Sequence, residues 1–164
     1  MQQKHYAALL AWLRGRPGCA AAVRWANRLL PAVVYTAYCG LLGFLALTGD
    51  ARLGRAAAVP AAVFVLGSLL RRRLAAPRPY EVYDIQPLVA RDRGGDSFPS
   101  RHLFSAGAIA MAFWYICPAA GAAMWAVAAL LAPARVLAGV HFPRDVAGGA
   151  LFGGLLAWAG LFLA

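Results

Sequence analysis

The feature that most constrains this chain is an uncharged run that covers residues 103–134. The hydrocarbon core of a bilayer is about 30 Å thick, and a helix of about 20 residues crosses it. The run is too long for one crossing, and the segment Pro118-Ala119-Ala120-Gly121 supplies a turn near its middle. We therefore predict a tight hairpin of two membrane spans.

Three further apolar stretches extend this pattern. Residues 29–49 carry no charge and can span a bilayer, and residues 56–70 can do so if their helix continues through Arg71–Arg73. Residues 146–164 form a fifth apolar stretch. The chain is 62% apolar and 13% charged, against roughly 45–50% and about 25% in soluble domains. We predict an all-α integral membrane helical bundle of about five transmembrane helices, placed multi-pass in the cell membrane.

The N-terminal stretch has a different pattern. Apolar residues recur at helical spacing at Tyr6, Leu9, Leu10 and Leu13. Arginines then interrupt any span, and they are Arg14, Arg16, Arg24 and Arg28. This pattern favours an interfacial amphipathic helix over a sixth crossing. The predicted division is an N-terminal interfacial segment, residues 1–28, followed by a membrane domain, residues 29–164.

The net charge of +10 raises the question of nucleic-acid binding. The arginines, however, cluster between long uncharged runs, and no lysine-rich tail or basic ribbon with interleaved aromatic residues is present. We interpret the charge as membrane-surface and phosphate chemistry. The expected partners are membrane lipids rather than nucleic acid, and the sequence does not indicate an oligomeric state.

Five spans predict which connections share a membrane face. The polar stretch 71–102 joins the second span to the third, and residues 135–145 join the fourth to the fifth. These two connections lie on one face because two crossings separate them. The remaining connections, residues 50–55 and 118–121, lie on the opposite face. His102, His141 and Asp145 can therefore converge at one surface.

The arginines near this surface suit an anion. Arg71, Arg78 and Arg135 offer planar forks of donors that match phosphate oxygens. Ser100 and the amides after it, including that of Arg101, lie where the third span begins, and a helix N-terminus binds anions. On helical spacing we expect Arg72 and Arg73 to point to other faces than Arg71.

The histidines and the aspartate suit phosphoryl transfer. Pro143 favours a first helical turn, so Asp145 is expected within one turn of His141, where it can orient the imidazole. His102 is then available as a general acid. Each feature alone has an ordinary explanation, such as a solvated histidine, a headgroup-binding arginine, or an acid that opposes the helix dipole. Their joint arrangement favours a catalytic site that needs no cofactor.

Three motifs resemble those of the type 2 phosphatidic acid phosphatase family. Arg71, six intervening residues and Arg78-Pro79 resemble its first motif, K-x6-R-P. The segment Pro99-Ser100-Arg101-His102 resembles P-S-G-H, and the segment from Arg135 through His141 to Asp145 resembles S-R-x5-H-x3-D. The motifs occur in the family's order and cover residues 71–145.

The resemblance implies a role for each matched residue. His141 would be the nucleophile that forms a phosphohistidine, Asp145 would orient it, and His102 would protonate the leaving oxygen. The phosphoryl group would be bound by Arg71, Arg78, Ser100, the Arg101 amide and Arg135. Family members need no metal. The sequence departs from the motifs at three positions, where Arg71 replaces lysine, Arg101 replaces glycine and Ala134 replaces serine.

The predicted function is hydrolysis of a lipid phosphate or diphosphate, with undecaprenyl diphosphate, phosphatidate and phosphatidylglycerol phosphate as compatible substrates. One alternative is a metal-dependent hydrolase that uses His102, His141 and Asp145 as ligands, although a cationic cage repels a metal. Another is a non-catalytic lipid-binding or transport protein, although no span interior carries an ionisable residue. The basic N-terminus predicts an active site on the cytoplasmic face of the membrane. Members of this family that act on envelope lipids usually work on the outer face, so the sequence leaves the face of the active site open.

Overall fold

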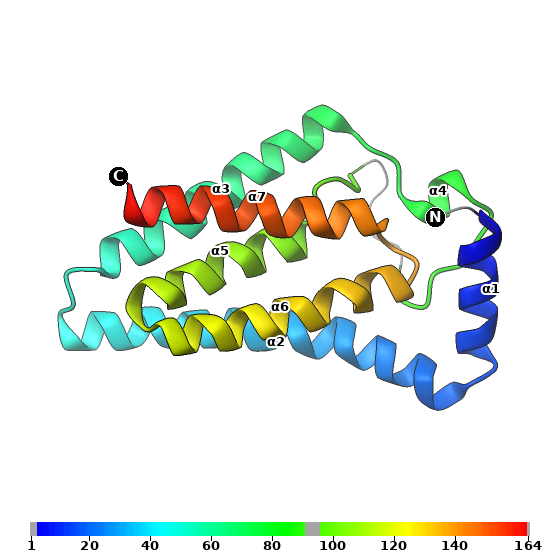
Figure 1. The fold of residues 1–164 in the computed structure, drawn as a ribbon, viewed down its shortest axis with the longest axis horizontal. Helices are drawn as coiled ribbons and strands as arrows, with labels where there is room; N and C mark the ends of the chain where they lie inside the picture. Colours follow the sequence, from blue (N-terminus) through cyan, green and yellow to red (C-terminus); the bar gives the residue numbers. More distant parts are fainter. Residues whose placement is uncertain (1–2, 91–95, 164) are drawn as a thin grey trace.

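The computed structural model describes residues 3–90 and 96–163, and these residues are helical apart from their connections. The helices, in chain order, are α1 (Gln3–Arg14), α2 (Pro17–Thr48), α3 (Leu53–Leu74), α4 (Pro79–Val82), α5 (Arg101–Ile116), α6 (Pro118–Leu137) and α7 (Pro143–Phe162). The five long helices run along a common direction, and α1 lies across one end of the bundle (Figure 1). The predicted all-α fold is confirmed.

Four segments in the described part of the chain are long and apolar enough to cross a membrane, and they contain α2, α3, α6 and α7. The fifth long helix, α5, has 16 residues, which extend about 24 Å at 1.5 Å per residue. It is shorter than a full span because it starts at Arg101 and ends at the turn before Pro118. Large apolar side chains such as Leu47, Leu151 and Leu155 are exposed on the outer helices, as expected of surfaces in contact with lipid. The protein is a multi-pass membrane protein.

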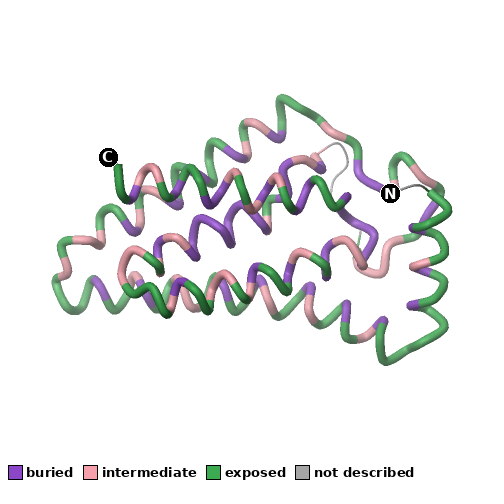
Figure 2. The backbone as a smooth tube through the Cα atoms, viewed as in Figure 1, coloured by how far each residue is buried: buried purple, intermediate pink, exposed green. Residues whose placement is uncertain are grey.

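Helix α5 is the centre of the bundle. Every residue from Leu103 to Ala110 is buried, and Figure 2 shows this burial along most of its length. Helix α7 packs closely against it because Gly149 and Gly153 have no side chain. A Cβ at Gly149 would lie 2.7 Å from the Ser100 carbonyl oxygen. This close approach brings the start of α7 beside the start of α5.

The connections lie as the span pattern predicts. The α3–α5 and α6–α7 connections lie at one end of the bundle together with α1 and the N-terminus (Figure 1). The α2–α3 turn at Asp50 and the α5–α6 turn at Cys117 lie at the other end. All three polar motifs therefore meet at a single end of the bundle.

The N-terminal amphipathic helix is present as α1. Its apolar residues Tyr6, Leu10 and Leu13 are buried, but they pack against the protein, where Tyr6 and Leu10 contact Ile85 and Phe142. Helix α1 therefore covers the end of the bundle. The next helix begins at Pro17 and continues without a break through residues 24–28, earlier than the predicted start at residue 29. The division at residues 28 and 29 stays a prediction.

Candidate active site

The α6–α7 connection places His141. Helix α6 ends at Leu137, and Gly139 adopts a left-handed backbone with φ of 77°, which turns the chain. Pro143 then starts α7. The His141 side chain is only 1% exposed, yet it lines a cavity of about 490 Å³ at this end of the bundle. The connection thus points a buried imidazole at an open cavity.

Asp145 lies behind this imidazole. Its Oδ2 lies 3.6 Å from His141 Nδ1 and accepts hydrogen bonds from the Phe142 amide at 2.9 Å and from Ser97 Oγ at 2.5 Å. Ser97 Oγ also lies 3.4 Å from His141 Nδ1. The carboxylate is fully buried. Since Asp145 and Ser97 occupy the Nδ1 side of the ring, Nε2 is the nitrogen that remains for chemistry in the cavity.

The charge state of His141 follows from its surroundings. Burial is the main cause that lowers the pKa of its imidazole to about 4 from 6.5. The Arg135 and Arg78 guanidiniums lower this pKa further, and the hydrogen bond to Asp145 opposes the shift. At neutral pH the imidazole is therefore uncharged, as a nitrogen nucleophile must be.

Buried arginines surround the cavity. Arg71 and Arg78 are each 3% exposed. Arg71 Nη1 donates to the Pro99 carbonyl at 2.7 Å, and its Nη2 donates to the Asp96 carbonyl. Arg78 Nη1 donates to the Val140 carbonyl at 3.5 Å. These contacts fix both guanidiniums before any anion arrives.

Arg135 is a buried arginine near the end of α6. Its Nη1 donates to Asn27 Oδ1 at 3.1 Å, and Asn27 Nδ2 donates to the Ala134 carbonyl at 2.8 Å. Arg135 is not part of the cavity lining, although its charge helps to lower the pKa of His141. The structure thus gives Arg135 a polar partner on α2.

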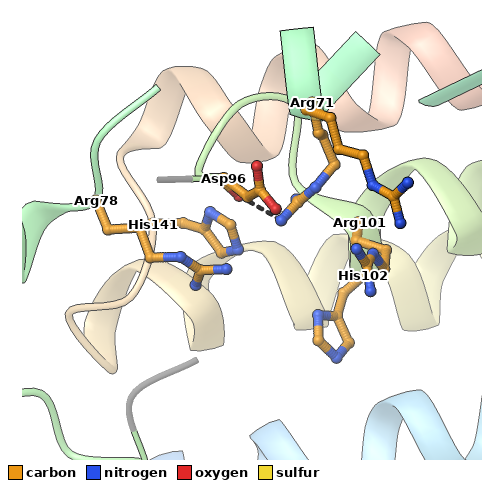
Figure 3. Close-up of a pocket in the computed structure, with 7 residues that line it drawn as sticks. Arg71, Arg78, Asp96, Arg101, His102 and His141 are labelled. Atoms are coloured by element: carbon orange, nitrogen blue, oxygen red, sulfur yellow. Dashed lines mark hydrogen bonds between the residues drawn. The ribbon is translucent and has the colours of Figure 1, made fainter. Parts of the chain in front are cut away.

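The start of α5 completes this end of the bundle. Ser100 precedes the first residue of α5, is fully buried, and its amide donates to the Asp145 carbonyl at 2.9 Å. Ser100 Oγ makes no hydrogen bond within the described residues. The next residues, Arg101 and His102, both line the cavity. Figure 3 shows these two side chains across the cavity from Arg78 and His141.

One sequence-based expectation about α3 is wrong. Arg72 was expected to point away from the Arg71 side, but it lines the same cavity. The reason is its place near the end of α3, where a long exposed side chain reaches round the helix. Arg73 is exposed and is not part of the lining.

A family comparison agrees with this arrangement. The model of the PAP2 superfamily matches residues 52–163, which include all three motifs. The chain belongs to the PAP2 superfamily. The family relationship supports the predicted enzyme class, a hydrolase of phosphate esters.

Relatives of this PAP2 protein include two curated phosphatases. Lipid A 1-phosphatase of Rhizobium etli is 35% identical over 94 residues, which are 55% of this chain and 40% of that protein. Lipid A 1-phosphatase of Rhizobium johnstonii is 34% identical over 105 residues, which are 61% of this chain and 41% of that protein. The chain thus spans about two fifths of the length of these curated relatives.

Two solved structures share the PAP2 fold. The PAP2 type phosphatidylglycerolphosphate phosphatase from Bacillus subtilis has a TM-score of 0.63 and 21% identity, and the match covers 95% of this chain and 90% of that one. Aquifex aeolicus LpxE has a TM-score of 0.68 and 24% identity, and the match covers 94% of this chain and 93% of that one. Both structural matches also include N-terminal residues that lie outside the family match at residues 52–163.

Sequence reasoning missed two residues that support His141. Tyr6 is fully buried, and its hydroxyl donates to the His141 carbonyl at 2.8 Å from α1. Burial raises the pKa of the Tyr6 hydroxyl far above its usual range, which keeps it a donor. Ser97 comes from the connection before α5. Neither residue belongs to a PAP2 motif quoted above, and no periodicity marked either as polar support for the site.

The shifted pKa of His141 gives a prediction for pH dependence. We expect the acid limb of kcat/KM to lie near pH 4 rather than near 6.5, because the imidazole stays neutral until the pH approaches its folded pKa. The folded chain also binds fewer protons than the unfolded chain between these values, so stability falls as pH falls through this window. Hydrolysis of a soluble phosphate ester, measured from about pH 3.5 to about pH 8 so that the range includes both pKa values, checks the limb. An acid limb centred near pH 6.5 would contradict the assignment of this limb to the buried His141 imidazole.

Proposed function

We propose that this protein hydrolyses a lipid phosphate or diphosphate through a phosphohistidine formed on His141. One observation carries the proposal. A buried neutral imidazole, backed by the Asp145 carboxylate at 3.6 Å, faces a cavity that Arg71 and Arg78 line. Such a site combines a nucleophile, its orienting group and preorganised positive charge for the equatorial oxygens of a phosphoryl transition state.

The proposed reaction has two steps. In the first, His141 Nε2 attacks phosphorus, the bond from phosphorus to the leaving oxygen breaks, and His102 gives that oxygen a proton. The Nδ1 proton of His141 stays on the ring against Asp145. In the second step, His102 takes a proton from water, the water oxygen attacks phosphorus, and the P–N bond breaks to release inorganic phosphate. The arginines bind the phosphoryl oxygens in both steps.

An apolar groove supports a lipid as the leaving group. A cavity of about 300 Å³ lies between α2, α3 and α5, and its lining includes Phe64, Ser105 and Ile109. His102, Ser105 and Ile109 are three and then four residues apart, so they lie on one face of α5. A hydrocarbon chain can therefore extend from an oxygen at His102 along this face, into the part of the bundle that lies within the bilayer.

The relatives narrow the substrate class. Two of them are named for removing the 1-phosphate of lipid A, and one solved neighbour is named as a phosphatidylglycerolphosphate phosphatase. We propose an envelope lipid that carries a terminal phosphate or diphosphate, with lipid A, undecaprenyl diphosphate, phosphatidate and phosphatidylglycerol phosphate as the compounds to test.

The experiment that tests this function is a phosphate-release assay on the purified protein in detergent. We expect release from at least one lipid phosphate of the panel, inhibition by orthovanadate, and no inhibition by a metal chelator. Inhibition by the chelator with recovery on metal addition would favour a metal-dependent hydrolase instead. An absence of phosphate release across the whole panel would overturn the proposal.

A prediction for the anion cage concerns Arg135. Replacement by lysine keeps the charge but loses the planar fork of donors, one of which donates to Asn27 Oδ1 at 3.1 Å. We expect kcat/KM to fall about tenfold or more, and orthovanadate affinity to fall with it, since both depend on bound equatorial oxygens. Inhibition curves with orthovanadate measure the second effect.

A matched control comes from the end of α3. Arg73 is exposed and does not line the cavity, so Arg73→Lys is expected to keep wild-type activity and orthovanadate affinity. If Arg135→Lys and Arg73→Lys behave alike, the arginines act as a diffuse surface charge and the cage assignment of Arg135 is wrong.

A further inference from the structure

The cavity carries more positive charge than a single phosphoryl group requires. Four arginines line it, and the described lining includes the acidic residue Asp96. Arg71 and Arg78 are buried and bonded to backbone carbonyls, and the buried Arg135 adds positive charge near His141 from outside the lining. Arg72 and Arg101 are different. Both are exposed, and within residues 3–90 and 96–163 neither is paired with a carboxylate.

Arg101 lies on the leaving-group side of the proposed reaction. It immediately precedes His102 on the first turn of α5, and Figure 3 shows both side chains across the cavity from His141. An in-line displacement puts the leaving oxygen opposite the nucleophile. Any charge that the leaving group carries next to that oxygen therefore lies near Arg101.

The Arg101 guanidinium also marks where the polar cavity meets the apolar groove. It lies 5.9 Å from the centre of the Phe64 ring, and Phe64 lines the groove assigned above to the lipid chain. A guanidinium placed over an aromatic ring still directs its N–H donors outward in its own plane. The side chain can therefore bind an anion at the point where a lipid chain would begin.

We propose that Arg72 and Arg101 form a second anion subsite for a phosphoryl group on the leaving group, which gives the enzyme a preference for lipid diphosphates over lipid monophosphates. The proposal rests on the proposed function. His141 Nε2 bonds to the terminal phosphorus, the bond to the bridging oxygen breaks, and His102 protonates that oxygen. A lipid monophosphate leaves, and its phosphate is held by Arg72 and Arg101. The cavity of about 490 Å³ is in the range of about 300–1,000 Å³ that holds whole small ligands.

The test compares two substrates that differ by one phosphate. Farnesyl diphosphate and farnesyl monophosphate are assayed with the wild-type protein, with Arg72→Gln, with Arg101→Gln and with the double variant. Each lost guanidinium removes charge-assisted hydrogen bonds, which are worth about tenfold or more. We expect the ratio of kcat/KM for the diphosphate to that for the monophosphate to fall about tenfold in each single variant, and further in the double variant. Arg73→Gln, which removes an exposed arginine outside the cavity, should leave the ratio at its wild-type value.

The outcomes separate this proposal from the proposed function. If the wild-type protein hydrolyses the compounds but the ratio stays within about twofold in the double variant, the subsite is wrong and the phosphatase assignment stands. Equal losses on both substrates also overturn the subsite, because they indicate a general contact such as lipid headgroup binding. If the wild-type protein releases phosphate from neither compound nor from the lipid panel, the proposed function itself fails.

Discussion

Replacing His141 by alanine is expected to lower phosphate release by about 10⁴–10⁶-fold, the range seen when a covalent nucleophile is removed. The physical reason is that no other described group occupies its position. The imidazole is buried and lines the cavity, and Asp145 and Ser97 occupy its Nδ1 side, which leaves Nε2 for the substrate. Phosphate release by the purified variant in detergent, followed over hours, gives the measurement. A rate within about tenfold of the wild-type rate would show that His141 is not the nucleophile.

The chain provides a matched control for this variant. His5 is an exposed histidine on α1, and His5→Ala should retain wild-type activity. Thermal unfolding in detergent checks that His141→Ala still folds. If it does not fold, a rapid-quench experiment on the wild-type protein decides the question, because a labelled substrate should leave an acid-labile, base-stable phosphate on His141.

His102 can be separated from His141 in the same experiment. With an ester whose leaving group needs no proton, such as p-nitrophenyl phosphate, His102→Ala should still form the phosphoenzyme. The rate of phosphoenzyme formation should fall much further, by about 10²–10⁴-fold, for a lipid phosphate, whose alkoxide leaves poorly without a proton. Equal decreases in this rate for both esters would remove the general-acid role from His102.

The sequence predicted those parts of the fold and site that are set by local rules. A bilayer requires long uncharged helices, so the apolar runs located α2, α3, α6 and α7 directly. The topology followed from counting crossings, and it brought the two histidines to the same end of the bundle. Asp145 could be placed against His141 because Pro143 starts a helix and fixes the spacing.

The remaining site contacts depend on tertiary packing. Tyr6 reaches His141 across 135 residues and Asn27 reaches Arg135 across 108 residues, and nothing in the local sequence around either residue indicates its partner. Arg72 shows a related limit. Helical spacing gives the direction of a Cβ atom, but the long side chain at the end of α3 reaches round the helix to the cavity.

Asp145→Asn is expected to retain the membrane fold but lower kcat by about 10²–10⁴-fold. Asp145 Oδ2 accepts hydrogen bonds from Ser97 Oγ at 2.5 Å and from the Phe142 amide at 2.9 Å, and it faces His141 Nδ1 at 3.6 Å. An asparagine has a single acceptor oxygen, which can keep the two bonds to Ser97 and Phe142. It no longer supplies the negative charge that holds a proton on Nδ1 and stabilises the ring as Nε2 bonds to phosphorus.

The pH profile distinguishes this catalytic effect from a structural one. The hydrogen bond to Asp145 raises the pKa of His141 against the larger effect of burial, so its loss should move the acid limb of kcat/KM to still lower pH while the rate falls. A loosened structure would admit water and shift the limb the other way, toward 6.5. Asp50→Asn is the control, because Asp50 pairs with Arg52 at the opposite end of the bundle and should leave the rate unchanged. If Asp145→Asn keeps the wild-type rate and the wild-type acid limb of kcat/KM, Asp145 has no catalytic role and is only an acidic residue in the first turn of α7.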